Sequence, residues 1–261
     1  MSRELLPLVL IHGYPLDHTM WFGVIASLGA GVRTIAPDLR GFGKSETALE
    51  GEPAIEAYAR DILRQLEESN IPRAVIAGMS MGGYVALALA EMAREKIAGL
   101  ALVNSQCFAD TEEARKARRE LIQKVREGGP SVAAQAAIPK MFAASRTSDP
   151  DFQRFVISGA EAAGVDGIAW ALEAMARRPD RSHILTDAFY PTVVLHSDED
   201  QFIPVEKARK MAELNPQTHF VSVKNAGHAA AIEAPDEVAD KMRKFLELCS
   251  KASETHPAEA S

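Results

Sequence analysis

Short apolar runs alternate along the chain with longer segments in which apolar residues recur at helical spacing. The runs are rich in aliphatic and β-branched residues and are bounded by turn residues, which is typical of buried strands. Such runs cover residues 8–11, 33–36, 74–77, 100–103, 192–195 and 220–223. Helical spacing covers residues 16–28, 54–69 and 84–90, and a final helix begins at Pro235. This alternation predicts an α/β fold, a three-layer structure with a mostly parallel sheet of about six strands.

The segment between the fourth and fifth predicted strands is too long for a simple crossover. Signals for helix starts and ends divide it into a helix from Asp110 or Thr111 to Gly128, one from Ser131 that Pro139 breaks, one from Asp149-Pro150 and one from Asp166. We therefore expect residues 107–190 to form a helical cap inserted into a core of residues 1–106 and 191–249. Residues 250–261 are small and polar, and they predict a disordered tail.

Composition limits the classes of partner. An apolar content of 47% over 261 residues is enough for the core of one domain. The net charge of −7 comes from dispersed charges without a basic stripe, which predicts neither a nucleic-acid nor an anionic membrane partner. We expect a soluble, cytoplasmic protein, because no apolar leader opens the chain and no run reaches the ~18 residues of a membrane span. Cys107 and Cys249 are widely separated, so we expect free thiols.

Gly78-Met79-Ser80-Met81-Gly82-Gly83 stands between a predicted strand and an apolar helix. In such a sharp turn the glycines make room for neighbouring backbone, and the serine hydroxyl projects alone. The helix that follows directs its free N–H groups toward the serine. Ser80 is therefore a candidate nucleophile, which needs a base because a serine hydroxyl has a pKa far above 7.

Among the seven histidines, His228 is the favoured base. It follows the last predicted strand in a Gly-His turn, where its side chain is free to lie along the end of the sheet. His12 and His196 also lie at strand ends, but the first belongs to a glycine and proline turn and the second precedes an acidic loop. We expect surface or packing roles for the remaining four, His18, His183, His219 and His256.

A carboxylate must hold the imidazole in one tautomer and stabilise the cation that forms on it. Asp198, Glu199 and Asp200 follow the fifth predicted strand in a loop that ends at Pro204. The chain order is serine, then acid, then histidine.

These motifs resemble the α/β-hydrolase superfamily in its serine esterase, enol-lactonase and cofactor-free haloperoxidase-like branch. The resemblance rests on His-Gly-Tyr-Pro at residues 12–15, Pro-Asp-Leu-Arg-Gly-Phe-Gly-Lys-Ser at 37–45, the Gly-x-Ser-x-Gly turn, the Asp-x-x-x-Pro loop and the Gly-His turn. It implies that Asp200, four residues before the loop proline, is the acid and that Asp198 shapes the turn. It also implies an oxyanion hole made by the backbone N–H groups of Tyr14 and Met81.

The chain departs from the family pattern at two places. Only seven residues precede the first predicted strand, so we expect the N-terminal antiparallel hairpin of many relatives to be missing. Position 79 is methionine where relatives often carry histidine, which makes the surroundings of the serine more apolar.

The expected activity is hydrolysis of small carboxylic esters through an acyl-enzyme. Enol-lactonase and cofactor-free perhydrolase or haloperoxidase activity are alternatives that share the triad, and a non-catalytic ligand receptor is a more distant one. Neither a metal nor an organic cofactor is implied, and the chain is expected to be a monomer or a homodimer. The expected substrate pocket is lined by Tyr14, Met141, Phe142, Trp170 and Phe202. The sequence does not identify the acyl or alcohol group of the substrate.

Overall fold

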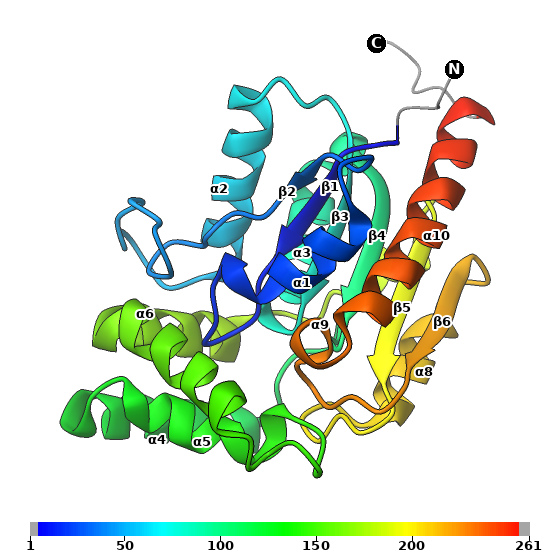
Figure 1. Cartoon of the computed structure of the whole chain (residues 1–261). Helices are drawn as coiled ribbons and strands as arrows, with labels where there is room; N and C mark the ends of the chain where they lie inside the picture. Colours follow the sequence, from blue (N-terminus) through cyan, green and yellow to red (C-terminus); the bar gives the residue numbers. More distant parts are fainter. Residues whose placement is uncertain (1–4, 256–261) are drawn as a thin grey trace.

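The computed structural model describes residues 5–255 and contains a six-stranded sheet (Figure 1). The strands are β1 (Leu8–Ile11), β2 (Thr34–Ile35), β3 (Ala74–Met79), β4 (Ile97–Val103), β5 (Thr192–Ser197) and β6 (Thr218–Val223). Their order is β2-β1-β3-β4-β5-β6, and every neighbouring pair is parallel. The predicted parallel sheet is confirmed, and its central strands are fully buried because helices cover both faces.

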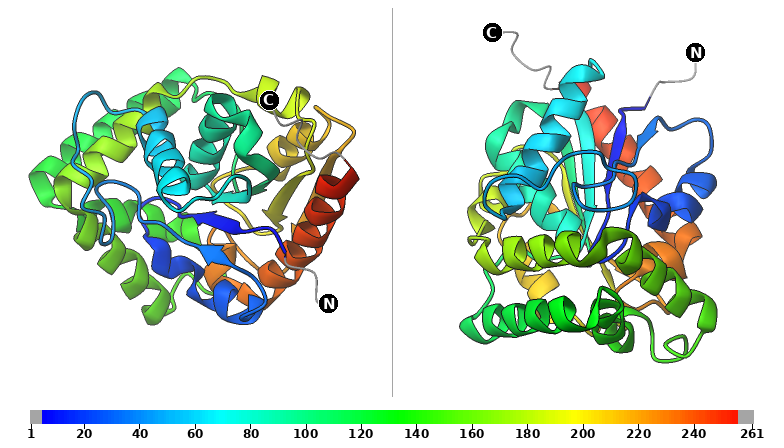
Figure 2. Two further views of the ribbon diagram at one scale, coloured as in Figure 1. Left: turned by 90° about the horizontal axis from the view of Figure 1, so that it is seen from above. Right: turned by 90° about the vertical axis from the view of Figure 1, so that its left-hand side faces the viewer.

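Helices α1 (Phe22–Leu28) and α10 (Pro235–Thr255) pack together on one face of the sheet, and α2 (Ile55–Glu68) and α3 (Met81–Met92) pack on the other (Figure 2). Helix α8 (Val205–Ala212) lies beside β5 and β6. The shorter elements are the 3₁₀ turns η1 (His18–Trp21) and η2 (Arg94–Lys96) and the helices α7 (Ser182–Thr186) and α9 (Ala230–Glu233). Helix α3 is buried along almost its whole length, as its continuous apolar sequence predicts.

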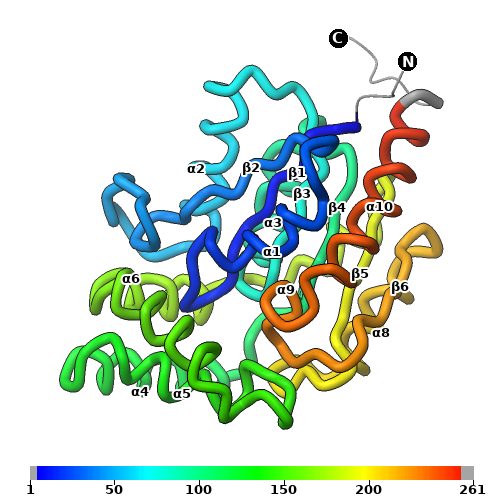
Figure 3. Tube along the Cα trace, in the orientation of Figure 1, coloured from blue at the N-terminus to red at the C-terminus, as the bar shows by residue number. Residues whose placement is uncertain are grey.

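Three helices gather beyond the carboxyl ends of the strands, and we call them the cap: α4 (Glu112–Gly128), α5 (Ser131–Met141) and α6 (Pro150–Arg177). Figure 3 shows the chain leaving β4, passing through these helices and returning to the sheet at β5. Thr111 caps α4 by accepting the backbone N–H of Ala114, and Gly129 ends it at a φ of 86°. The limits of the cap at residues 107 and 190 stay a prediction.

One prediction about the cap helices is wrong and another is confirmed. Helix α5 continues through Pro139 to Met141. Both Pro139 and Gln135 are exposed, so the carbonyl that loses its helical partner can bond to water. The helices predicted from Asp149-Pro150 and from Asp166 are both present, and α6 comprises the two of them on either side of a break at Gly164, where φ is 65° and ψ is −179°.

Helix α6 is also the one described helix that is long and apolar enough to cross a membrane, judged by length and composition alone. It packs against both α4 and α5 and is kinked near its middle. Its apolar side chains therefore form the interior of the cap.

The predicted tail begins too early. Helix α10 runs to Thr255, so a disordered tail from residue 250 is wrong for residues 250–255. The helix is already packed on the sheet when it reaches Ser250, and the small residues that follow contain no breaker. The remainder of the predicted tail, residues 256–261, lies outside the described residues.

Candidate active site

Ser80 occupies a strained turn between β3 and α3, with φ of 52° and ψ of −114°. Side chains are excluded on either side of it. A Cβ on Gly78 would clash with the carbonyl of Gly82, and a Cβ on Gly82 would clash with the carbonyl of Ile11. The Ser105 hydroxyl donates to the Ser80 carbonyl at 2.7 Å. The glycines predicted to permit a sharp turn therefore sit where no other residue fits.

The two predicted oxyanion donors lie on either side of this turn. Met81 is the first residue of α3, where backbone N–H groups have no partner within the helix. Tyr14 follows β1, the neighbour of β3, and the two loops pack so closely that a Cβ on Gly13 would lie 3.3 Å from the Cβ of Ser80. Their role as oxyanion donors stays a prediction.

His12 shapes the loop that carries Tyr14. Its buried ring accepts the Leu39 N–H at Nε2 (3.0 Å), so the other nitrogen, Nδ1, carries the proton and donates to the Gly13 carbonyl (3.1 Å). Burial lowers the pKa of this histidine, which favours the neutral ring that these two bonds require. His12 is thus occupied in holding the turn.

His228 and Asp200 face each other at the carboxyl end of the sheet. The imidazole Nδ1 lies 3.0 Å from Oδ1 and 2.9 Å from Oδ2 of the carboxylate. The Asp200 side chain is fully buried and also accepts the backbone N–H groups of Phe202 (2.8 Å) and Ile203 (3.0 Å). Asp198 is instead 35% exposed and lies 3.5 Å from the Lys224 ammonium group.

The surroundings of Asp200 favour its charged form. Burial alone would raise its pKa, but His228 and the backbone N–H of Ile203 hold the pKa below the usual value of 3.8. The carboxylate is therefore ionised at neutral pH. It can fix the proton on Nδ1 of His228 and leave Nε2 free to accept another.

Asn104, which sequence reasoning did not single out, joins the loops that carry His228 and the acid. It follows β4, and its amide Nδ2 lies within hydrogen-bond distance of the Ser197 hydroxyl (2.9 Å) and of the carbonyls of Gly227 (2.9 Å) and His228 (2.8 Å). Its Oδ1 accepts the Ser197 N–H at 3.0 Å. A polar residue at the end of a buried strand was the signal that could have identified it.

Glu233 in α9 ties the histidine loop to the cap. Its carboxylate accepts the Gly227 N–H at 2.7 Å and the Ala143 N–H at 2.9 Å. Burial raises the pKa of this carboxyl group above its usual value, and the two N–H groups offset only part of that effect. No sequence pattern pointed to this residue.

A cavity of about 230 Å³ opens beside the serine. Ser80 and His228 both lie in its wall. The sheet end also contributes Tyr14, Phe202 and Ile203, and the ring of Phe202 lies 4.8 Å from that of His228. The cap side is built chiefly from small or apolar residues, among them Ala133, Ala136, Ala137, Met141, Leu172 and Met175.

The five predicted pocket residues divide into two groups. Tyr14, Met141 and Phe202 line the cavity. Phe142 is completely buried and stacks on Phe152, with ring centroids 4.9 Å apart. Trp170 lines a different groove, formed by α4, α6 and the loop of residues 49–53, and the Arg40 guanidinium lies 5.9 Å from its ring. Placing Phe142 and Trp170 in the pocket was wrong, because both serve packing within or beneath the cap.

Three polar residues in the cavity wall went unnoticed in the sequence. They are Tyr84, Gln106 and Arg118. Arg118 lies in a run of charged residues, Glu112 to Glu120, that has the composition of a solvated helix face. Nothing in that run indicates that one of its arginines turns inward.

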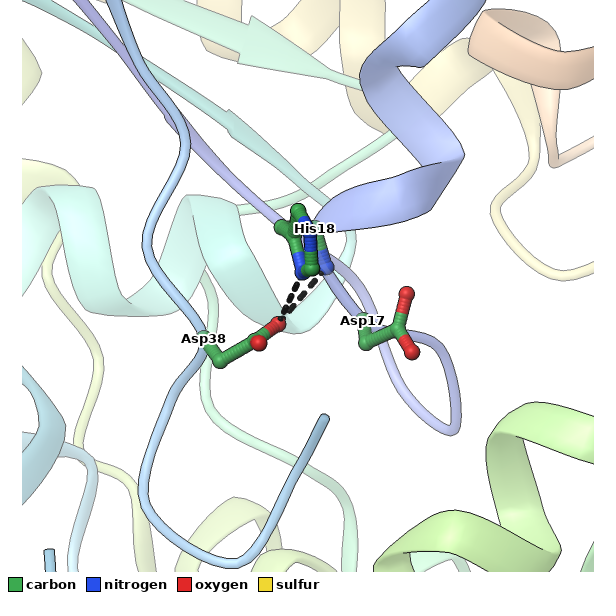
Figure 4. A group of neighbouring side chains, drawn as sticks. All are labelled: Asp17, His18 and Asp38. Atoms are coloured by element: carbon green, nitrogen blue, oxygen red, sulfur yellow. Dashed lines mark hydrogen bonds and ion pairs between the residues drawn. The ribbon is translucent and has the colours of Figure 1, made fainter. Parts of the chain in front are cut away.

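Asp17, His18 and Asp38 form the one cluster among residues 5–255 with the spacing of a metal site (Figure 4). Asp38 accepts the N–H and ring Nδ1 of His18 (2.9 and 2.8 Å) and the N–H of Lys44 (2.8 Å). Asp17 caps η1 by accepting the Thr19 N–H. These hydrogen bonds occupy carboxylate oxygens that a metal ion would need. The cluster therefore has a structural role, which is to hold the two loops in shape.

Both cysteines are buried free thiols, as predicted. Burial raises the pKa of each thiol to about 12. Neither is a nucleophile at neutral pH.

Similar proteins share this fold and carry hydrolase names. The family model of the α/β hydrolase fold matches residues 7–235. A thermophilic esterase from Thermogutta terrifontis, solved with malate bound, is 36% identical, with a TM-score of 0.89 and coverage of 94% of this chain and 90% of that one. The enol-lactonase from Burkholderia xenovorans LB400 is 25% identical, with a TM-score of 0.83 and coverage of 93% and 92%.

A curated relative from Pseudomonas putida is the dihydrolipoyllysine-residue acetyltransferase component of an acetoin cleaving system. It is 29% identical over 243 residues, which are 92% of this chain, and the match spans 63% of the length of that relative. The family match over most of the chain, together with the sheet order and the serine turn after β3, shows that this protein belongs to the α/β-hydrolase family.

Proposed function

We propose that this hydrolase is a carboxylesterase that works through an acyl-enzyme on Ser80. The Ser80 hydroxyl attacks the ester carbonyl while His228 takes its proton, and Asp200 orients and stabilises the imidazolium. The backbone N–H groups of Tyr14 and Met81 bind the oxyanion. His228 then protonates the leaving alcohol, and water releases the acid by the reverse transfers.

The observation that carries this proposal is the contact between Asp200 and His228, whose ring lies in the wall of the same cavity as Ser80. A buried carboxylate on Nδ1 leaves the second nitrogen as a base in a cavity that also holds a serine on a strained turn. The likeness to an esterase at 36% identity supports an ester as the substrate.

An enol-lactonase is the second candidate, and the likeness to the enzyme from Burkholderia xenovorans favours it. The two activities share the nucleophile, base and oxyanion donors. In a lactone the leaving alcohol stays joined to the acyl group, and in an open-chain ester it does not. The size and shape of the cavity decide which of these substrates fits.

The proposal is tested by measuring hydrolysis of p-nitrophenyl acetate and butyrate, and of an enol-lactone, by the wild type and by Ser80→Ala. We expect the variant to lose ester hydrolysis by at least about 10⁴-fold. Equal rates for the two proteins would refute Ser80 as the nucleophile. Tight ligand binding by a wild type without turnover of any ester or lactone would instead identify a receptor.

The setting proposed for this activity is the cytoplasm, with small-molecule esters or lactones as the partners. Two buried free thiols are compatible with a reducing compartment.

A further inference from the structure

One permanent charge lies in the wall of the cavity beside Ser80. It is the guanidinium of Arg118 on α4, and the described residues of the wall include no aspartate or glutamate. Charged side chains are rarely placed against apolar walls unless a partner compensates them. The partners of Arg118 therefore show whether its charge is already neutralised within the protein.

Asp110 is the carboxylate that Arg118 contacts, and it is shared. Arg118 Nε donates to Asp110 Oδ2 at 2.6 Å, while Arg178 lies 2.7 Å from Oδ1. Asp110 and Arg178 are almost completely buried, with side chains 4% and 2% exposed, whereas Arg118 is 23% exposed. Arg178 already neutralises Asp110, so the group carries one positive charge in excess, and Arg118 is the member that borders the cavity.

Tyr14 supplies a second, independent observation. Its hydroxyl is buried and has no hydrogen-bond partner among the described residues, although Tyr14 lines the cavity. Burial raises the pKa of this phenol, and nearby Arg118 opposes that shift in part. The hydroxyl is consequently neutral, and it lies in the wall as a hydrogen-bond donor without an acceptor.

A third cation, after Arg118 and Arg178, lies next to a residue of the cavity wall. Lys207 donates to the Gln106 side chain at 2.9 Å, and Gln106 lines the cavity. Within residues 5–255 Lys207 forms no ion pair. Three cations, Arg118, Arg178 and Lys207, therefore outnumber the two carboxylates next to the wall, since Asp110 contacts the two guanidinium groups and Asp200 contacts His228.

We propose that the cavity selects esters whose acyl group ends in a carboxylate, which Arg118 and the Tyr14 hydroxyl bind away from the reacting carbonyl. The inference rests on the proposed esterase function and adds a substrate class to it. A carboxylate supplies the acceptors that the Tyr14 hydroxyl lacks and the negative charge that the arginine pair lacks. Hydrogen bonds to charged groups are stronger than those between neutral groups, so the contacts of Arg118 and Tyr14 with a carboxylate should contribute more to selectivity than contacts with the apolar wall.

The test compares matched substrates, each pair differing only in the end of the acyl chain. Monomethyl succinate, glutarate and adipate carry the terminal carboxylate, and methyl butyrate, valerate and hexanoate carry a methyl group in its place. For at least one chain length we expect the wild type to prefer the charged ester by about 10- to 100-fold in kcat/KM. The preference should decrease as salt is raised, because the attraction is electrostatic.

Variants separate the two groups that bind the carboxylate. Arg118→Gln should reduce the ratio of charged to neutral ester by about tenfold or more, and Arg118→Lys should restore part of it. Tyr14→Phe removes only the unpartnered hydroxyl, so it should fold normally and reduce the ratio by several-fold. Arg119→Gln is the matched control, since Arg119 is 57% exposed on the same helix, pairs with Glu173 and lines a different groove. The ratio of kcat/KM for the charged ester to that for the neutral ester should be the same in Arg119→Gln as in the wild type.

Binding provides a readout that does not depend on turnover. Calorimetry with the Ser80→Ala variant should give tighter binding of the preferred monomethyl dicarboxylate than of its neutral counterpart. If both esters bind or react equally well, or if Tyr14→Phe and Arg118→Gln leave the ratio unchanged, the substrate class is wrong and the esterase proposal stands. If the wild type hydrolyses no ester while the binding preference holds, the esterase proposal fails and the carboxylate site stands.

Discussion

The carboxyl end of the sheet and the cap contribute to the same cavity, but they are held in different ways. At the sheet end, hydrogen bonds fix each group: Asp200 accepts two backbone N–H groups as well as His228, and Asn104 joins three segments of chain. The cap side consists largely of alanines and other apolar residues, which fix shape through packing. The sheet end thus sets the chemistry, and the cap sets which substrates fit.

The cap is connected to the sheet end by hydrogen bonds and by close packing. Glu233 binds backbone N–H groups on both sides, and the Ala229 N–H donates to the Met141 carbonyl at 2.9 Å. Gly227 packs so closely on Phe142 and Ala143 that a Cβ there would clash. Substitutions in the cavity wall of the cap that leave these connections intact should change selectivity more than they change the reacting groups.

The largest effect is expected at the acid. Asp200→Asn removes the charge that holds the tautomer of His228, and we expect kcat to fall by about 10⁴-fold. Asp198→Asn, in the same loop after β5 but partly exposed, should keep activity close to that of the wild type. Steady-state kinetics on p-nitrophenyl butyrate measure both. A larger loss in Asp198→Asn than in Asp200→Asn would reverse the choice of acid.

The next effect tests the hydrogen bonds of the sheet end. Asn104→Gly keeps the φ of 44° without strain and removes the amide that serves Ser197, Gly227 and His228. We expect the free energy of unfolding to fall by about 2–4 kcal/mol, because buried carbonyls lose their donor. Asn70→Gly is the matched control, exposed at a φ of 51°. Equal values for the two variants in urea denaturation would contradict the assigned role of Asn104.

A smaller effect is expected at the connection between the two regions. Glu233→Gln keeps one acceptor of the two, so the free energy of unfolding at neutral pH should change by at most about 1 kcal/mol. Burial raises the pKa of Glu233, so the folded protein holds that proton more tightly than the unfolded chain. The stabilisation from this proton is complete below the ordinary pKa of 4.5 and is lost as pH rises through the raised value.

The pH dependence can be measured by urea denaturation at a series of pH values. Wild-type stability should fall relative to Glu233→Gln as pH increases above 4.5. Glu247→Gln, at an exposed position on α10, serves as the control and should show no such divergence. Parallel curves for the wild type and Glu233→Gln would mean that the carboxyl group titrates alike in the folded and unfolded states.

The smallest effect concerns the cap. Ala136 lies in the cavity wall and is exposed, so Ala136→Leu should narrow the cavity without overpacking the protein. We expect kcat/KM to fall several-fold for hexanoate esters relative to acetate esters, with thermal stability unchanged. A series of p-nitrophenyl esters measures this. A uniform loss across all chain lengths would show that the cap affects the reacting groups as well.

The same contrast explains what the sequence could predict. The sheet and the serine turn follow from short local patterns, whereas the resemblance to the family was needed to choose Asp200 among the three acids of its loop. Phe142 and Trp170 were misplaced because helical spacing identifies a buried face but not whether that face meets another helix or a cavity. Glu233 acts through a contact with Ala143, distant in the chain, and such a contact leaves no local pattern. Asn104 left only the signal of a polar residue at the end of a buried strand, and nothing in the charged run around Arg118 indicated that this arginine turns inward.

The central claim is that Ser80 is the activated nucleophile of this cavity. Its most direct test is labelling with a fluorophosphonate, followed by intact mass measurement and peptide mapping. We predict one adduct per chain, located on Ser80, and none in Ser80→Ala under the same conditions. An adduct on another residue, or equal labelling of the two proteins, would contradict the claim.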